Sequence, residues 1–306
     1  MEQGVHEIVV EAATYSESVT IGGHSNESSS DYIVLKAKSG DEHKGIFDSK
    51  VIVAGGIIIN DAYTRVNDIQ FNGQIKPQQS NCIIKNVLGK ANVSFLFDAD
   101  NHSGIRFECC IAWSPSASNT YGFYFPWPGF GQNVQCYNCL AHGFASAFRY
   151  VGVTNCVVLE SRSLAAFSGN TNGDYNASWD TTAPGANSIH NLTVGQAAFK
   201  DKDNGDFHIK LNSVLKGAGD PQIALFIQDI DLESIDGSDW PMGPDYPVPT
   251  CWTYTAHYKN SRRLYRIGGP EKYPKNLRVP SNVDTSTGQM IDEGELINPS
   301  KYTITN

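Results

Sequence analysis

A short acidic segment, Asp98-Ala99-Asp100-Asn101-His102, contains residue types that can do chemistry. Two carboxylic acids at a set separation can hydrolyse a glycosidic bond, one as acid and the other as base or nucleophile. We therefore take Asp98, Asp100 and His102 as catalytic candidates. The alternative interpretation is an ordinary acidic loop.

An unusually aromatic segment, Tyr121 to Phe130, reads YGFYFPWPGF. Flat aromatic rings can form a platform on which sugars stack, so Tyr121, Tyr124 and Trp127 are ligand-binding candidates. Trp179, in a second long insert at 170–187, is a fourth. The same side chains could instead form a hydrophobic protein contact or fold back over the chain.

The chain after residue 247 is rich in proline, which interrupts regular strand ladders. Basic and aromatic residues are interleaved there, unlike in typical disordered tails. We expect an irregular C-terminal extension over 247–306 that docks on its own chain or on a neighbouring subunit. The candidate docking residues are Trp252, Tyr258, Arg262, Arg263 and Arg266.

Seven cysteines are present, and Cys136 and Cys139 form a CxxC pair that could indicate a zinc or redox site. No separate second CxxC or CxxH pair completes a four-ligand zinc set. Cysteine is among the most buried residue types, and these lie in strand-like runs such as VQCYNCLA. We predict reduced core cysteines, no metal site and no cofactor.

Composition indicates an all-β protein, because the chain has 28 glycines and no long run with a helical apolar period. The net charge of −9 argues against general nucleic-acid binding, which depends on Lys and Arg. No apolar run approaches the ~18 residues of a membrane span. Met1 to Ala13 does not resemble a signal peptide, so we expect synthesis in the cytoplasm.

A repeat runs through the middle of the chain. Six segments align (RVNDIQF, IIKNVLG, RFECCIAW, QCYNCLA, VVLESRS and SIHNLTV), each with a residue where a strand would turn. Coils of about 20 to 30 residues are typical of stacked parallel strands. The predicted turn residues are Asp68, Asn86, Cys109, Asn138, Glu160 and Asn191. A second predicted ladder, inside the stack, consists of Phe97, Phe125, Phe148, Phe167 and Phe199.

Two further motifs resemble the pectate-lyase-like β-helix superfamily. Thr14-Tyr15-Ser16-Glu17 matches an element of its first coils, and Asn204-Gly205-Asp206-Phe207-His208-Ile209 resembles its last-coil strand. The resemblance implies a right-handed parallel β-helix over residues 1–246. No capping helix precedes Val5, so we expect an open N-terminal coil, whose unpaired edge favours association.

The superfamily includes pectate lyases, polygalacturonases and phage tailspike glycosidases. The paired-aspartate NTD and DD motifs and the GHG of polygalacturonases are missing from this sequence. We rank first a structural virion protein (a bacteriophage fibre, tail or decoration component) found in the virion or extracellularly, whose partners are other subunits. A polysaccharide lyase or glycosidase and a non-catalytic carbohydrate-binding adhesin are the alternatives.

Overall fold

The computed structural model divides the chain into two compact units, Met1–Pro247 and Val248–Asn306. In the first unit it describes residues 5–23, 28–48, 50–91, 95–115, 121–126, 133–161, 164–169, 172–221, 228–232, 235 and 240–247. In the second it describes the strands alone: 252–258, 261–267, 283–284, 289–292, 295–296 and 303–305.

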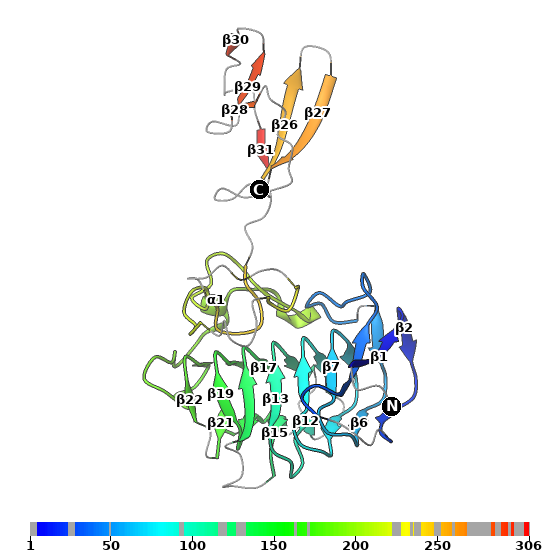
Figure 1. The fold of residues 1–306 in the computed structure, drawn as a ribbon. Coiled ribbons are helices and arrows are strands. Elements are labelled where there is room, and N and C mark those ends of the chain that lie inside the picture. Colours follow the sequence, from blue (N-terminus) through cyan, green and yellow to red (C-terminus); the bar gives the residue numbers. More distant parts are fainter. Residues whose placement is uncertain are drawn as a thin grey trace. The chain divides into compact units, whose positions relative to one another are not determined.

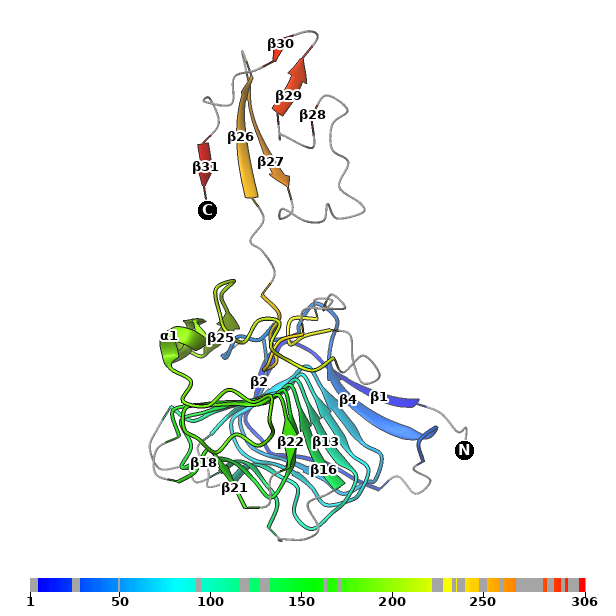
Figure 2. The same ribbon diagram turned by 90° about the vertical axis from the view of Figure 1, so that its left-hand side faces the viewer.

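The first unit is a right-handed parallel β-helix, as the sequence predicted. Its coils stack side by side, each contributing short strands to three parallel sheets (Figure 1, Figure 2). The first sheet contains β1 (Val5–Val10), β4 (Tyr32–Ala37), β7 (Arg65–Asn67), β10 (Ile83–Lys85), β13 (Ile105–Glu108), β16 (Val134–Tyr137), β19 (Gly152–Thr154) and β22 (Gly173–Asp174). The second contains β2 (Ala13–Tyr15), β5 (Val51–Val53), β8 (Gln70–Phe71), β11 (Leu88–Lys90), β14 (Ile111–Trp113), β17 (Leu140–His142), β20 (Val157–Leu159) and β23 (Ala177–Ser178). The third contains β3 (Val19–Ile21), β6 (Ile57–Ile59), β9 (Ile75–Pro77), β12 (Phe95–Asp98), β15 (Tyr121–Tyr124), β18 (Ser146–Arg149) and β21 (Phe167–Ser168).

A single left-handed residue turns the chain from the first sheet into the second in each of six successive coils. These residues are Asp68, Asn86, Cys109, Asn138, Asn155 and Tyr175, with φ between 50° and 61°. The predicted turn ladder is therefore confirmed at its first four positions and wrong at Glu160 and Asn191. Both of those residues also have positive φ, but Glu160 follows the second-sheet strand β20 and Asn191 lies beyond the last coil. The coil after Asn138 is short, so its turn comes already at Asn155.

Asparagine suits these turns because it tolerates the left-handed region and its amide can bond along the stack. Asn86 Nδ2 donates to Asp68 Oδ1 at 3.2 Å, and Asn155 Nδ2 donates to Asn138 Oδ1 at 3.0 Å. Asn138 and Asn155 are 1% and 0% exposed. These hydrogen bonds satisfy polar groups that would otherwise be buried without a partner.

Four stacked phenylalanines run through the interior beneath the third sheet. Phe97, Phe123, Phe148 and Phe167 are paired in register, with successive ring centroids 4.5, 4.8 and 5.1 Å apart and nearly parallel planes. The predicted ladder contained Phe125 in place of Phe123. That choice was wrong by two residues, a shift that keeps the side chain on the same face of the strand.

The last ladder position, Phe199, is wrong for a different reason. The described residues between 199 and 246 (199–221, 228–232, 235 and 240–246) form no further coil but a return segment that packs outside the stack. After α1 (Val194–Ala197), β24 (Phe199–Asp201) and β25 (Asp206–Ile209) pair as an antiparallel hairpin around the 3-10 turn Lys202–Asn204. The sequence predicted a last-coil strand at Asn204 to Ile209. These residues form β25, but in this hairpin and not in a coil.

The return segment covers the outer face of the second sheet. Apolar side chains of that face (Leu88, Ile111, Trp113, Leu140, Val157 and Leu159) form a second core with Phe199, Phe207, Ile230, Trp240 and Met242. The asparagine turns help to fasten it, since Asn138 Nδ2 donates to Gly243 O at 3.1 Å. The second sheet is therefore occupied by the chain itself.

The N-terminal strand β1 is an edge, because it pairs with β4 on one side and ends the first sheet. Three of its apolar side chains, Val5, Ile8 and Val9, are 48–49% exposed. Among the described residues, β4 is the one strand that pairs with β1, and the open first coil stays a prediction.

The second unit holds short antiparallel strands between proline-rich stretches. β26 (Trp252–Tyr258) pairs with β27 (Ser261–Ile267) and with β31 (Thr303–Thr305). β29 (Gln289–Asp292) pairs with β28 (Val283–Asp284) and β30 (Glu295–Leu296). In the part of the chain that is described, no helix has the length and apolarity needed to cross a bilayer.

Candidate functional site

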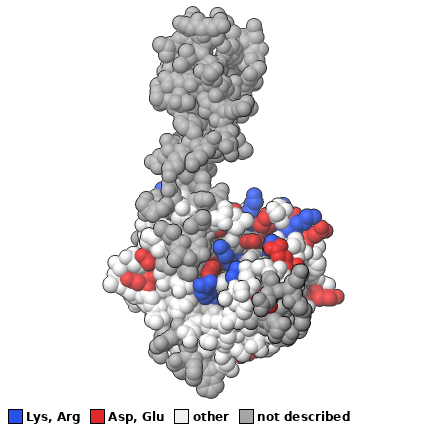
Figure 3. All heavy atoms as spheres, viewed as in Figure 1, with Lys and Arg blue, Asp and Glu red and all other residues white. Residues whose placement is uncertain are grey.

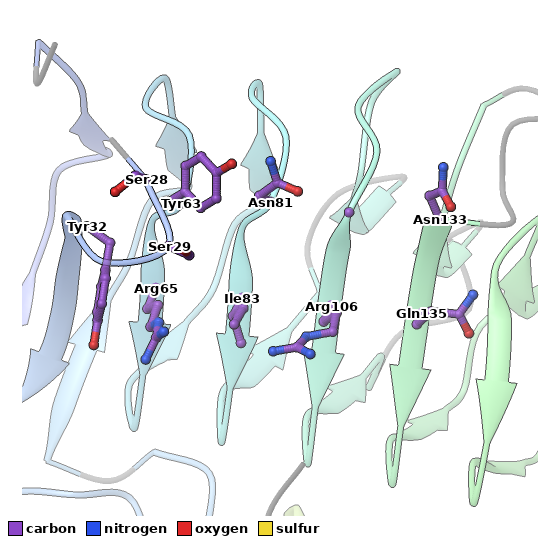
Figure 4. Close-up of a pocket in the computed structure, with 11 residues that line it drawn as sticks. Ser28, Ser29, Tyr32, Tyr63, Arg65, Asn81, Ile83, Arg106, Asn133 and Gln135 are labelled. Atoms are coloured by element: carbon purple, nitrogen blue, oxygen red, sulfur yellow. The ribbon is translucent and has the colours of Figure 1, made fainter. Parts of the chain in front are cut away.

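A groove of about 460 Å³ crosses the outer face of the first sheet. It runs over five consecutive strands (β4, β7, β10, β13 and β16) and the loops that lead into them (Figure 4). Its lining consists of Ser28, Ser29, Tyr32, Tyr63, Arg65, Asn81, Ile83, Gly104, Arg106, Asn133 and Gln135. Because parallel strands lie ~4.8 Å apart, five of them span about 19 Å along the helix axis.

Strand register aligns the floor of the groove. Arg65, Ile83, Arg106 and Gln135 are paired across β7, β10, β13 and β16, so their side chains form one outward-facing row. Figure 4 shows this row, with Tyr63, Asn81 and Asn133 along the rim at the strand starts. A linear ligand lying along the axis would therefore meet a new side chain at every coil.

The two arginines are held in place by their neighbours. The Arg65 guanidinium carbon lies 3.8 Å from the centre of the Tyr32 ring, a stacked cation–π contact. Arg106 Nε lies 3.2 Å from Glu108 Oε1. Glu108 is 4% exposed, and burial raises its pKa, an effect opposed by Arg106, Lys85 and Arg65.

The charge of the groove differs from that of the chain. The lining contains two arginines and no acid, whereas the whole chain carries a net charge of −9. The face in Figure 3 shows basic and acidic side chains intermixed over the N-terminal coils. A groove that combines arginines, tyrosines and amides suits an extended anion with hydroxyl groups, because arginine binds carboxylates and phosphates in a bidentate way.

The catalytic candidates lie on another face. Asp98 ends β12 in the third sheet, where its Oδ2 accepts a hydrogen bond from Gln74 Nε2 at 3.0 Å and its Oδ1 accepts one from the Asp100 backbone at 2.9 Å. Asp100 Oδ2 is 3.4 Å from Lys76 Nζ. Burial raises the pKa of Asp98. His102 is half-buried, and its backbone N–H donates to Ala99 O at 3.3 Å. A catalytic role for this segment stays a prediction.

The structure brings the two separately predicted clusters together. Asp98, Tyr124 and Arg149 are paired in register across β12, β15 and β18. The Tyr121 and Tyr124 rings stack 4.9 Å apart, and Arg149 lies over Tyr121 and donates a hydrogen bond to its hydroxyl. The row contains one acidic residue, Asp98, and one basic residue, Arg149, whose charges offset each other. It therefore favours an anionic ligand less than the groove on the first sheet does.

The remaining aromatic candidates are scattered. Trp127 lies outside the described residues. Trp179 is 40% exposed in the bend after β23, at the C-terminal end of the stack. It is not part of the groove lining.

The docking candidates of the second unit all fall on strands. Trp252 and Tyr258 begin and end β26, and Arg262, Arg263 and Arg266 lie on β27. Their side chains lie outside the described part of the chain, and their proposed role is untested.

The predicted core position of the cysteines is confirmed for the six described ones, which are all buried and free; Cys251 lies outside the described residues. Burial raises the pKa of Cys136 to about 11. Cys139 Sγ lies 3.4 Å from Phe107 O inside the stack. The CxxC pair therefore belongs to the interior.

Scans of the chain against protein-family models, curated proteins and solved structures find no match. The resemblance to the pectate-lyase-like superfamily is supported at the level of the fold, a parallel β-helix. Fold alone does not define function, so the function must be argued from the groove.

The arginines of the groove were missed in the sequence. Arg65 and Arg106 begin the aligned segments RVNDIQF and RFECCIAW, and comparing the first residues of all the repeats would have placed them in one column. The prediction of the fold depends on the turn residues alone, and these carry no information on the outward-facing column.

Proposed function

We propose that this protein binds an acidic polysaccharide along the outer face of its first sheet. The observation that carries the proposal is the row formed by Arg65, Ile83, Arg106 and Gln135 in a groove without acidic lining residues. Repeating strands offer repeating contacts, which suits a repeating polymer better than a compact ligand.

The chemistry of the lining supports a sugar acid. The arginines can bind carboxylate groups, and Asn81, Asn133 and Gln135 can both donate to and accept from hydroxyl groups. Tyr63 and Tyr32 supply ring faces on which the apolar side of a sugar can stack. Neutral glycans would use the amides and rings but offer no carboxylate to the arginines.

The test compares two changes that each remove arginine from an outer sheet face. The double variant Arg65→Ala/Arg106→Ala should lose most binding to polygalacturonate, alginate or hyaluronan in affinity electrophoresis. Arg149→Ala is the matched control, since Arg149 also stacks on a tyrosine but lies on the third sheet. It should bind as the unchanged protein does. Equal loss in both variants, or no acidic glycan bound by the unchanged protein, would contradict the proposal.

The same incubations separate binding from catalysis. We propose a binding protein, so the polysaccharide should be recovered at its original length. Release of unsaturated ends would indicate a lyase, and release of reducing ends without unsaturation a glycosidase. In either case Glu108, the buried acid beside Arg106, is the first residue to replace.

A structural role in an assembly such as a virion is a second candidate, favoured by the exposed apolar edge β1. An unpaired strand edge can add a strand from another chain. Replacing Ile8 and Val9 by Lys should reduce self-association measured by light scattering. A monomer that stays monomeric at high concentration would remove this support, whatever the outcome for glycan binding.

A further inference from the structure

The return segment contains a cluster with the composition of a metal site. His208 on β25, Asp231 and Asp245 come from three separate parts of the chain, and one ligand atom of each lies within 4.8 Å of the others. His208 Nε2 is 2.9 Å from Asp231 Oδ1. The wide sequence separation explains why no ligand motif is visible in the sequence.

The histidine is oriented as a metal ligand would be. Its Nδ1 contacts the Asp206 carboxylate, which also accepts a hydrogen bond from the His208 backbone N–H at 3.2 Å. In the metal-free protein both ring nitrogens donate to carboxylates, Nδ1 to Asp206 and Nε2 to Asp231. A bound cation would take the place of the Nε2 proton, while Nδ1–H stays on Asp206. A carboxylate behind a histidine is the usual outer partner of a metal-bound imidazole, because it fixes the tautomer and the ring plane.

Hydrogen bonds also fix the positions of the two carboxylate ligands, Asp231 and Asp245. Asp245 is 4% exposed, and its Oδ2 accepts a hydrogen bond from the Ile209 backbone at 2.6 Å. The Asp231 backbone donates to Asp229 Oδ1 at 3.0 Å, and Asp229 Oδ2 accepts from the Tyr246 backbone at 3.2 Å. The loops that carry the ligands are therefore tied to each other and to β25.

Gly45 keeps one side of the cluster clear. A Cβ atom at this position would lie 2.8 Å from His208 Nε2 and 2.9 Å from Asp231 Oδ1. The backbone there has φ +71°, and its N–H donates to His43 Nδ1 at 2.9 Å. Glycine thus leaves space beside the two ligand atoms, in a turn anchored by a buried histidine.

Charge also favours a cation. Three carboxylates (Asp206, Asp231 and Asp245) meet one imidazole in a largely buried place, and buried charges are normally paired or metal-bound. We propose that His208, Asp231 and Asp245 bind one divalent transition-metal ion, Zn²⁺ or Mn²⁺, that fastens the loops around Asp231 and Asp245 to β25. One imidazole and two carboxylates suit these ions better than Ca²⁺, which takes only oxygen ligands.

The test is titration of the chelator-treated full chain with Zn²⁺, Mn²⁺ or Ca²⁺ by calorimetry, with thermal unfolding in parallel. We expect one Zn²⁺ or Mn²⁺ per chain and little Ca²⁺ binding. At a free metal concentration 100 times Kd, the unfolding equilibrium should shift about 100-fold toward the folded state. Asp231→Asn and Asp245→Asn should abolish binding, and Asp206→Asn should weaken it about 10- to 100-fold. Asp203→Asn, an exposed acid in the same hairpin, is the matched control and should change nothing.

If the variants fail to fold, X-ray absorption spectroscopy of the Zn²⁺-loaded unchanged protein tests the proposal without them, because it identifies the atoms bound to the ion. It should show nitrogen and oxygen ligands. Sulfur ligands would place the ion at a cysteine and overturn the proposal. So would the lack of one-to-one binding, or the same loss in Asp203→Asn as in Asp231→Asn.

Discussion

Replacing Asp68 by Asn should stabilise the protein. Asp68 is half-buried at the first left-handed turn, with φ 61°, and burial raises its pKa from 3.8 to about 6. The folded state therefore binds a proton more tightly than the unfolded state. The fold loses stability as pH rises from 3.8 to about 6, and the loss is complete above pH 6. The rise from 3.8 to about 6 corresponds to at most about 3 kcal/mol at pH 7.

Asparagine preserves both the left-handed turn and the hydrogen bond from Asn86 at this position. It tolerates the left-handed turn, and its Oδ1 can still accept the hydrogen bond that Asn86 Nδ2 donates at 3.2 Å. Its neutral amide also carries no charge into this half-buried turn. We therefore expect a gain of about 1–3 kcal/mol at pH 7, or several degrees in Tm.

The assay is urea or thermal unfolding of Asp68→Asn between pH 4 and pH 7. The gain should shrink as pH falls through 6 toward 3.8, because both states of the unchanged protein then hold the proton. Asp48→Asn is the control, since Asp48 also has positive φ (60°) but its side chain is 61% exposed beside Lys90. A gain that persists at pH 4, or that appears equally at Asp48, would refute the reasoning.

Three further predictions concern the interior and the return segment. Phe123→Ala should cost about 3–5 kcal/mol in urea unfolding, because it removes the second ring of the four-ring stack; a loss below 1 kcal/mol would contradict the stacked register. Six of the seven thiols should react with a thiol reagent at pH 8 only after unfolding, since burial raises the pKa of groups such as Cys82 to about 12; rapid labelling of the native chain at two or more thiols would count against this. Asn155→Gly keeps the left-handed turn but loses hydrogen bonds of 2.7 Å to both the N–H and C=O of Asp220. It should speed proteolysis near Asp220, with Asn191→Gly as control.

Repeats in the sequence revealed the fold because the turn residue is chemically distinctive. Asp68, Asn86 and Asn138 could be aligned although loops of different length separate them, since Asn and Asp tolerate left-handed backbone. The alignment failed first at Asn155, because the coil before it is short, and then at Tyr175, where the same turn is made by a residue with no preference for it. A tyrosine there gives no sequence signal.

Which side chains point into the stack, and which outer sheet face is covered, was harder to predict than the positions of the strands. Phe123 and Phe125 have the same parity, so alternation could not decide which ring joins the stack. The second sheet is apolar outside as well as inside because described residues of the return segment, such as Phe207 and Trp240, cover it. A strand buried on both faces carries no alternation, and the covering segment is distant in sequence, so neither could be predicted from local pattern.

The most direct test of glycan binding is hydroxyl-radical footprinting with and without an acidic oligosaccharide, read residue by residue by mass spectrometry. Tyr32 and Tyr63 line the groove, whereas Tyr124 lies on the third sheet. We predict that the ligand protects Tyr32 and Tyr63 from oxidation and leaves Tyr124 unchanged. Protection of Tyr124 alone, or no protection at a saturating ligand concentration, would contradict a binding groove on the first sheet.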